Sequence, residues 1–103
     1  MKIYLDDERT PPIGWTLVRW PQEAIDILKT GDVEIISLDH DLGDDTIGTG
    51  YDVILWIEEQ VAMNNMAPPI IKVHSSNTSA RLKMLAGIES IYKIASSKTS
   101  PNN

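Results

Sequence analysis

Residues 33–41, which read VEIISLDHD, hold the stretch that decides the fold. The first six residues form a nearly continuous apolar run of the kind found in strands buried in a parallel sheet. The run ends abruptly in Asp39, His40 and Asp41, which are all residues that bind ligands or move protons. A buried strand that ends in such a polar group is typical of the carboxyl edge of an open α/β sheet, where ligands bind.

Two other runs have the same design. Residues 3–5 lead into Asp6-Asp7-Glu8-Arg9, and residues 70–73 lead into His74-Ser75-Ser76-Asn77. If all three runs are parallel strands of one sheet, their polar ends meet at one edge. The sequence therefore predicts a site at that edge.

The rest of the chain alternates strand and helix patterns, which favours an α/β sandwich. A second strand is expected at residues 16–20 and a last short one at residues 90–95. Helices are expected from Pro21 to a stop at Gly31, over residues 51–63, and from Asn77 or Thr78 to Gly87. Residues 7–15 contain Pro11-Pro12 and Gly14 and indicate a loop. We expect one domain over residues 1–95 and a disordered tail over residues 96–103.

Composition excludes several classes of function. The 103 residues include no cysteine, so thiolate zinc sites, redox motifs and cysteine nucleophiles are excluded. Neither a long apolar N-terminal segment nor an 18-residue apolar stretch occurs, so we expect a cytoplasmic protein with no membrane partner. A formal net charge of −6 disfavours binding to duplex DNA through its backbone. A small nucleotide or an RNA end stays compatible, because a bound metal ion neutralises such a ligand locally.

The acidic residues at the strand ends are candidate metal ligands. Asp6, Asp7 and Asp39, with Asp41 beside them, offer the hard oxygen atoms that Mg²⁺ or Mn²⁺ takes. The alternative for any one of them is the capping of a turn. Glu8 is expected to be a solvated loop charge.

The two histidines, His40 and His74, are candidate acid or base groups, because histidine titrates near neutral pH. A lone loop histidine is often incidental, but here the second lies at a neighbouring strand end. We therefore predict catalytic roles for His40, His74 and Asp39.

A phosphate-binding site is expected at the start of the helix after residue 77. Ser75, Ser76 and Asn77 bring hydroxyl, amide and free backbone N–H groups to that point, and Arg81 lies one turn further on. Simple helix capping is the alternative. Arg9 either pairs with the acidic residues or holds a second phosphate.

The chain resembles the receiver domain of two-component response regulators over roughly residues 1–95. The strings LDDERTPP (5–12), SLDHDLG (37–43), TGYDV (49–53) and VHSSN (73–77) more closely resemble a family found in bacteria and phages, the cyclic-phosphate processing receiver domain. This resemblance implies a flavodoxin-like three-layer sandwich with about five parallel strands in the order 2-1-3-4-5. It also implies action on nucleic acid ends or nucleotides that carry a cyclic phosphate.

The chain departs from a signalling receiver in three ways. The first connection is too short for a crossover helix, so we expect an extended loop there. His74 falls where receivers have a switch serine or threonine. The invariant lysine of receivers would fall near Ile94, one residue beyond Lys93.

The leading hypothesis is a metal-dependent phosphoesterase that opens or removes a cyclic phosphate on a nucleotide or RNA end. In this hypothesis the carboxylates hold Mg²⁺ or Mn²⁺, and His40 and His74 relay protons. One alternative is a divergent receiver that is phosphorylated on Asp39. Another is a nucleotide-binding module without catalysis.

Overall fold

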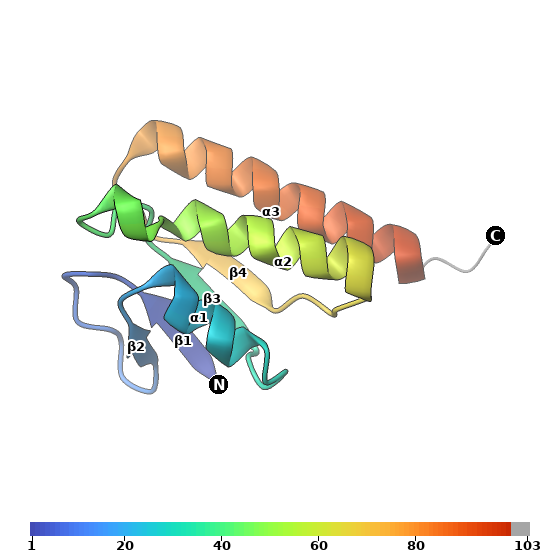
Figure 1. Cartoon of the computed structure of the whole chain (residues 1–103), viewed down its shortest axis with the longest axis horizontal. Coiled ribbons are helices and arrows are strands. Elements are labelled where there is room, and N and C mark those ends of the chain that lie inside the picture. Colours follow the sequence, from blue (N-terminus) through green and yellow to red (C-terminus); the bar gives the residue numbers. More distant parts are fainter. Residues whose placement is uncertain (100–103) are drawn as a thin grey trace.

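A computed structural model of the protein describes residues 1–99, which form a parallel sheet and three α-helices (Figure 1). The elements in chain order are β1 (Lys2–Leu5), β2 (Thr16–Val18), α1 (Pro21–Leu28), β3 (Ile35–Leu38), the 3₁₀ turn η1 (Asp45–Ile47), α2 (Gly50–Asn64), β4 (Ile70–Val73) and α3 (Thr78–Thr99). The α/β class expected from the alternating patterns is confirmed.

The sheet has four strands in the order β2-β1-β3-β4, and all neighbouring strands are parallel. Leu5 lies beside Leu38 of β3, and Leu38 lies beside Val73 of β4. The residues that follow these three strands therefore start at the same level. Residues 6–15, which join β1 to β2, contain no helix, as the length of this connection predicts.

The helices begin where the sequence chemistry favours it. Pro21 occupies the first turn of α1, and the Glu23 carboxylate accepts the free backbone N–H groups of Arg19 and Trp20. At the start of α2, the Thr49 side chain accepts the N–H of Tyr51, while Asp52 accepts the N–H of Thr49. The N–H of Gly50 donates to the carbonyl of His40, which holds the start of α2 next to the end of β3.

The core lies on one face of the sheet only. The face toward the helices carries residues with exposed fractions of 0%, namely Ile3, Leu5, Ile36 and Leu38. Helix α2 packs against both α1 and α3, so the three helices form a single layer over that face. On the opposite face, Ile70 is 55% exposed, Lys2 and Lys72 are exposed, and Tyr4 is half-buried.

The expected three-layer sandwich is therefore wrong for residues 1–99, which form two layers. A strand buried on both faces needs helices on both sides. The short β1–β2 connection supplies no helix, and the described residues contain none on the second side. We call this second side the open face. Its strand residues are Lys2, Tyr4, Leu17, Ile35, Ser37, Ile70 and Lys72. Asp6, Asp39 and His74, the first residues after three of the strands, continue it.

The last part of the chain is also different from expectation. Residues 90–95 are not a fifth strand, and residues 96–99 are not part of a tail, because both segments belong to the 22-residue helix α3. Residues 100–103 of the expected tail lie outside the described residues. Gly87 does not end the helix but lets it approach α2, since a Cβ there would lie 2.8 Å from Cγ2 of Ile54. Within the described chain, α3 and the other helices lack the combination of length and apolar character needed to cross a membrane.

Candidate functional site

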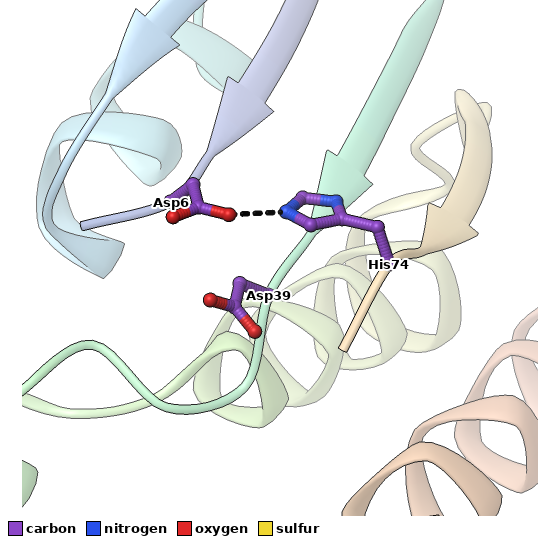
Figure 2. Close-up of side chains that lie close together, drawn as sticks. All are labelled: Asp6, Asp39 and His74. Atoms are coloured by element: carbon purple, nitrogen blue, oxygen red, sulfur yellow. Dashed lines mark hydrogen bonds and ion pairs between the residues drawn. The ribbon is translucent and has the colours of Figure 1, made fainter. Parts of the chain in front are cut away.

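Asp6, Asp39 and His74 are the first residues after β1, β3 and β4. Backbone hydrogen bonds continue the sheet through them, because the N–H of Asp39 donates to Leu5 and that of His74 donates to Leu38. Side chains alternate along strands, so all three point to the open face. One ligand atom from each lies within 4.8 Å of the other two. Figure 2 shows the three side chains facing the same space. We call these three residues the strand-end trio.

Asp6 is the most restrained member of the trio and is 1% exposed. Its Oδ1 accepts the backbone N–H groups of Glu8 and Arg9, both at 2.8 Å. Its Oδ2 lies 3.0 Å from Nε2 of His74. Burial raises the pKa of Asp6, but these hydrogen bonds outweigh it and leave the pKa below its usual value. Asp6 is therefore ionised at neutral pH.

His74 is held at both ring nitrogens. An ionised Asp6 has no proton to give, so Nε2 must donate to it, and Nδ1 then accepts from the Ser37 hydroxyl at 2.8 Å. The Tyr4 ring stacks on the imidazole, with ring centroids 4.1 Å apart and an interplanar angle of 5°. Burial lowers the pKa of His74, although Asp6 and Asp39 act in the opposite direction. The neutral ring thus carries its proton on Nε2, which faces Asp6.

The Asp39 carboxylate accepts fewer hydrogen bonds than that of Asp6. Its Oδ1 accepts the N–H of His40 at 2.9 Å, but burial and the charges of Asp6 and Asp7 raise its pKa. The backbone at this point is tightly packed, because a Cβ at Gly50 would overlap the carbonyl oxygen of Asp39. The start of α2 thus fixes Asp39 in a place where its negative charge is unfavourable.

A cavity of about 220 Å³ opens beside the trio. It is lined by Asp6, Asp7, Glu8, Arg9, Asp39, Asp41 and Ser76. All the predicted carboxylate ligands therefore face one space, together with Glu8, which the sequence analysis treated as a loop charge. Most of this lining is acidic.

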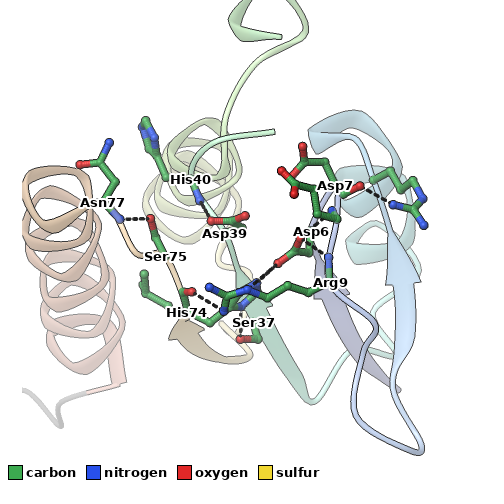
Figure 3. Close-up of polar contacts among 12 residues, drawn as sticks. Asp6, Asp7, Arg9, Ser37, Asp39, His40, His74, Ser75 and Asn77 are labelled. Atoms are coloured by element: carbon green, nitrogen blue, oxygen red, sulfur yellow. Dashed lines mark hydrogen bonds and ion pairs between the residues drawn. The ribbon is translucent and has the colours of Figure 1, made fainter. Parts of the chain in front are cut away.

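His40 lies apart from His74. Its Nδ1 is 2.8 Å from Oδ1 of Asp41, whose other oxygen is 3.4 Å from Nδ2 of Asn77. In Figure 3 the His40 ring stands near Asn77 and away from Asp6. The hydrogen bond from His40 lowers the pKa of Asp41. The two histidines therefore occupy different sides of the site, and His40 does not line the cavity.

At the predicted phosphate-binding site, some of the polar groups are already used in hydrogen bonds that cap helix α3. Oδ1 of Asn77 accepts the N–H of Ala80, and Oγ of Ser75, which is 6% exposed, accepts the N–H of Asn77. Arg81 donates to the carbonyl of Val73 and does not line the cavity. Ser76 does line the cavity and is exposed.

Arg9, a predicted phosphate ligand, and Arg19, which was not predicted, lie beside the acidic residues, whereas Lys93 does not. Arg9 reaches from the β1–β2 connection to the carbonyl of His74 at 3.2 Å, with its Nε 3.9 Å from Asp6 (Figure 3). Arg19 donates to the carbonyl of Asp7 at 2.6 Å. Lys93 is exposed on α3, next to Tyr92, whose hydroxyl bonds to Pro69 before β4. Lys93 is therefore at the opposite end of the strands from the trio.

Sequence reasoning missed three supporting residues: Ser37, Tyr4 and Gly50. Ser37 is the one uncharged polar residue in an apolar run, two positions before Asp39 and hence on the same face. This position was a usable signal. Tyr4 could be placed beside His74 only with the register across β3, which the sequence does not contain.

A parallel α/β sheet with an acidic pair after β1 and an aspartate after β3 defines a receiver-like domain. The family model described as the cyclic-phosphate processing receiver domain matches residues 1–90. The chain belongs to this family, as the resemblance in its strand-end motifs indicated. No curated protein and no solved structure matches the chain.

Proposed function

We propose that the protein is a metal-dependent phosphoesterase that opens or removes a cyclic phosphate on a nucleotide or RNA end. The convergence of Asp6, Asp39 and His74 within 4.8 Å is the observation that carries this proposal. It puts two carboxylates and a proton-bearing nitrogen at one place on the open face. Membership in a family described by cyclic-phosphate processing supports the same reaction class.

The carboxylates of the trio suit a divalent cation. Two oxygen atoms on opposite sides of an ion that binds oxygen at about 2.1 Å are about 4.2 Å apart, so side-chain atoms within 4.8 Å of one another need only a small movement to share it. Asp7 and Asp41 add oxygen atoms around the same cavity. Burial and the charges of Asp6 and Asp7 raise the pKa of Asp39, and a bound cation would favour its ionised form. Asp6 and Asp39 would hold Mg²⁺ or Mn²⁺, with Asp7 and Asp41 at its outer side, and the bound ion would polarise the phosphoryl oxygen.

His74 is the group that moves the proton. Hydrolysis forms one bond from phosphorus to water oxygen and breaks one bond from phosphorus to ribose oxygen. The water gives up one proton and the ribose oxygen takes one up, so the protons balance. Nε2 is the ring atom that faces the trio, and Ser37 and Tyr4 hold the ring in that orientation. Arg9, which is 53% exposed and lines the cavity, is placed to contact a phosphate oxygen. His40, held by Asp41, serves as an outer proton carrier at the rim.

A turnover assay tests this proposal. The substrates are 2′,3′-cyclic mononucleotides and cyclic dinucleotides, each with Mg²⁺ or Mn²⁺, and the opened monoester is the product to detect. We expect turnover that requires the metal, is lost in Asp39→Asn, and is retained in Asp26→Asn. Asp26 is a matched control, because it is an exposed aspartate on α1 whose carboxylate accepts a hydrogen bond from Gln22 and pairs with Lys29, away from the trio.

The same assay separates the receiver alternative from the enzyme. A phosphoacceptor domain would label Asp39 stoichiometrically with acetyl phosphate and release no opened product. Stoichiometric labelling without multiple turnover would replace the enzyme proposal with a divergent receiver. Binding of nucleotide without either reaction would leave a nucleotide-binding module.

A further inference from the structure

The open face is a surface of three rows of side chains. The register places Lys2, Ile35 and Ile70 in the first row, and Leu17, Tyr4, Ser37 and Lys72 in the second. The strand-end trio is the third row. Rows two residues apart are separated by about 6.6 Å along the strands, so the surface extends about 13 Å from the trio. That length is more than a single nucleotide needs.

The charge of the open face differs from that of the whole chain. The protein has 15 acidic and 9 basic residues, for a formal net charge of −6. The first and second rows nevertheless contain two lysines, Lys2 and Lys72, and no carboxylate. Both lysines are exposed. The part of the sheet that leads to the trio is therefore locally basic and complements a polyanion.

The same rows offer apolar and aromatic surface. Ile70 is 55% exposed, and Ile35 and Tyr4 are half-buried. Trp15 meets Tyr4 edge to face, with ring centroids 6.1 Å apart, and Tyr4 in turn stacks on His74. An aromatic series therefore runs from the open face into the trio. Sheet surfaces that combine lysines with aromatic groups bind single-stranded nucleic acid through the backbone and the bases.

We infer that the open face binds a single strand of RNA and guides its phosphate-bearing end to the trio. The backbone of the strand would contact Lys72 and then Lys2, and its bases would pack on Tyr4, Ile35 and Ile70. The identity of the end group rests on the proposed function, but binding of the strand does not require turnover. The surface thus selects an oligonucleotide over a mononucleotide.

The test compares two pairs of lysine substitutions that change net charge equally. The variant Lys2→Gln/Lys72→Gln alters the open face, whereas Lys29→Gln/Lys93→Gln alters α1 and α3. Binding of a short fluorescent single-stranded RNA with a 3′-phosphate is measured by anisotropy over a range of salt. We expect the open-face pair to weaken binding about tenfold and to reduce the salt slope by about 1.4, at about 0.7 per lost phosphate contact. The control pair should change neither quantity.

Turnover of a 2′,3′-cyclic mononucleotide separates this inference from the proposed function. The open-face variant should keep mononucleotide turnover, because Lys2 and Lys72 lie outside the cavity. RNA binding that depends on these lysines without any turnover would retain the inference and reject the proposed reaction. The inference would be overturned if both lysine pairs weakened RNA binding equally, or if the unaltered protein bound no RNA. Sedimentation showing a dimer that Lys72→Glu dissociates would assign the face to a second copy instead.

Discussion

The two faces of the same sheet have opposite characters, and neighbouring residues illustrate the difference. Leu38 points to the helices and is fully buried, whereas Asp39 points to the open face beside two other carboxylates. The alternation of side chains along β3 separates these roles at the level of single residues. One face therefore supplies the stability of the fold, and the other can carry charged groups that the fold alone would not favour.

This comparison implies that the helix-covered face supports unfavourable chemistry on the open face. Burial and like charge raise the pKa of Asp39, so its ionised form opposes folding. The apolar contacts of the helical layer must offset that cost. Proteins commonly accept reduced stability at sites whose geometry serves function.

The largest expected effect is on rate and concerns the open face. His74→Ala should reduce turnover of a cyclic phosphate by about 100-fold to 10,000-fold, because it removes the proton-bearing Nε2. The affinity for Mn²⁺, measured by calorimetry, should change little if the carboxylates hold the ion. His40→Ala is the matched comparison and should reduce turnover less, since His40 bonds to Asp41 and stands away from Asp6. A large loss of metal affinity in His74→Ala would instead make His74 a metal ligand.

The second-largest expected effect is on the free energy of unfolding and concerns the face of the sheet that the helices cover. Leu38→Ala should lower the free energy of unfolding by about 2–5 kcal/mol, because it removes a fully buried side chain and leaves a cavity. Denaturant unfolding measures this change. The exposed residue Leu82 on α3 is a matched control, and Leu82→Ala should cost far less. Similar losses in the two variants would mean that the core does not lie between the sheet and the helices.

Gly50→Ala tests the connection between the faces. A Cβ at this position overlaps the backbone of Asp39, so either α2 or Asp39 must move, at a cost of about 1–3 kcal/mol. We expect both lower stability and weaker binding of Mn²⁺. In Gly87→Ala the added Cβ meets only side chains, and metal binding should be unchanged. Unaltered metal affinity in Gly50→Ala would separate Asp39 from the packing of α2.

The smallest expected effect on stability is that of Asp39→Asn, and it should stabilise the metal-free protein. Because the pKa of Asp39 is raised on folding, the carboxyl group favours the folded state below its unfolded pKa, and this contribution is lost as pH rises through the folded pKa. Asparagine should therefore raise the melting temperature of the metal-free protein at pH 7 by a few degrees, at about 4–8 °C per kcal/mol. The gain should shrink on acidification toward pH 4. Thermal unfolding at the two pH values measures it, and a gain that grows in acid would contradict the account.

Sequence reasoning predicted the residues whose place at the edge of the sheet follows from chain position alone. Asp6, Asp39 and His74 follow apolar runs, and parallel pairing brings such ends together. The covering of the sheet was not predictable in this way, because the apolar run at residues 33–38 suits a strand buried on both faces. Whether a second layer exists depends on helices elsewhere in the chain.

Helix α3 shows the other limit. Ile88, Ile91 and Ala95 have helical spacing, but Gly87 resembles a helix stop, and the β-branched residues favoured a strand. The structure keeps Gly87 inside the helix because the close approach to Ile54 of α2 requires a small residue there. Contacts between distant segments thus outweighed the local preference.

The central claim is that the carboxylates of the strand-end trio, Asp6 and Asp39, bind a divalent cation, and thermal unfolding with Mn²⁺ tests it most directly. A ligand that binds only the folded protein adds about 2.7 kcal/mol at a hundredfold excess over its Kd. We expect the melting temperature of the unaltered protein to rise as Mn²⁺ is added, and that of Asp39→Asn to stay nearly constant. An equal rise in both proteins, or no rise in the unaltered protein, would contradict the claim.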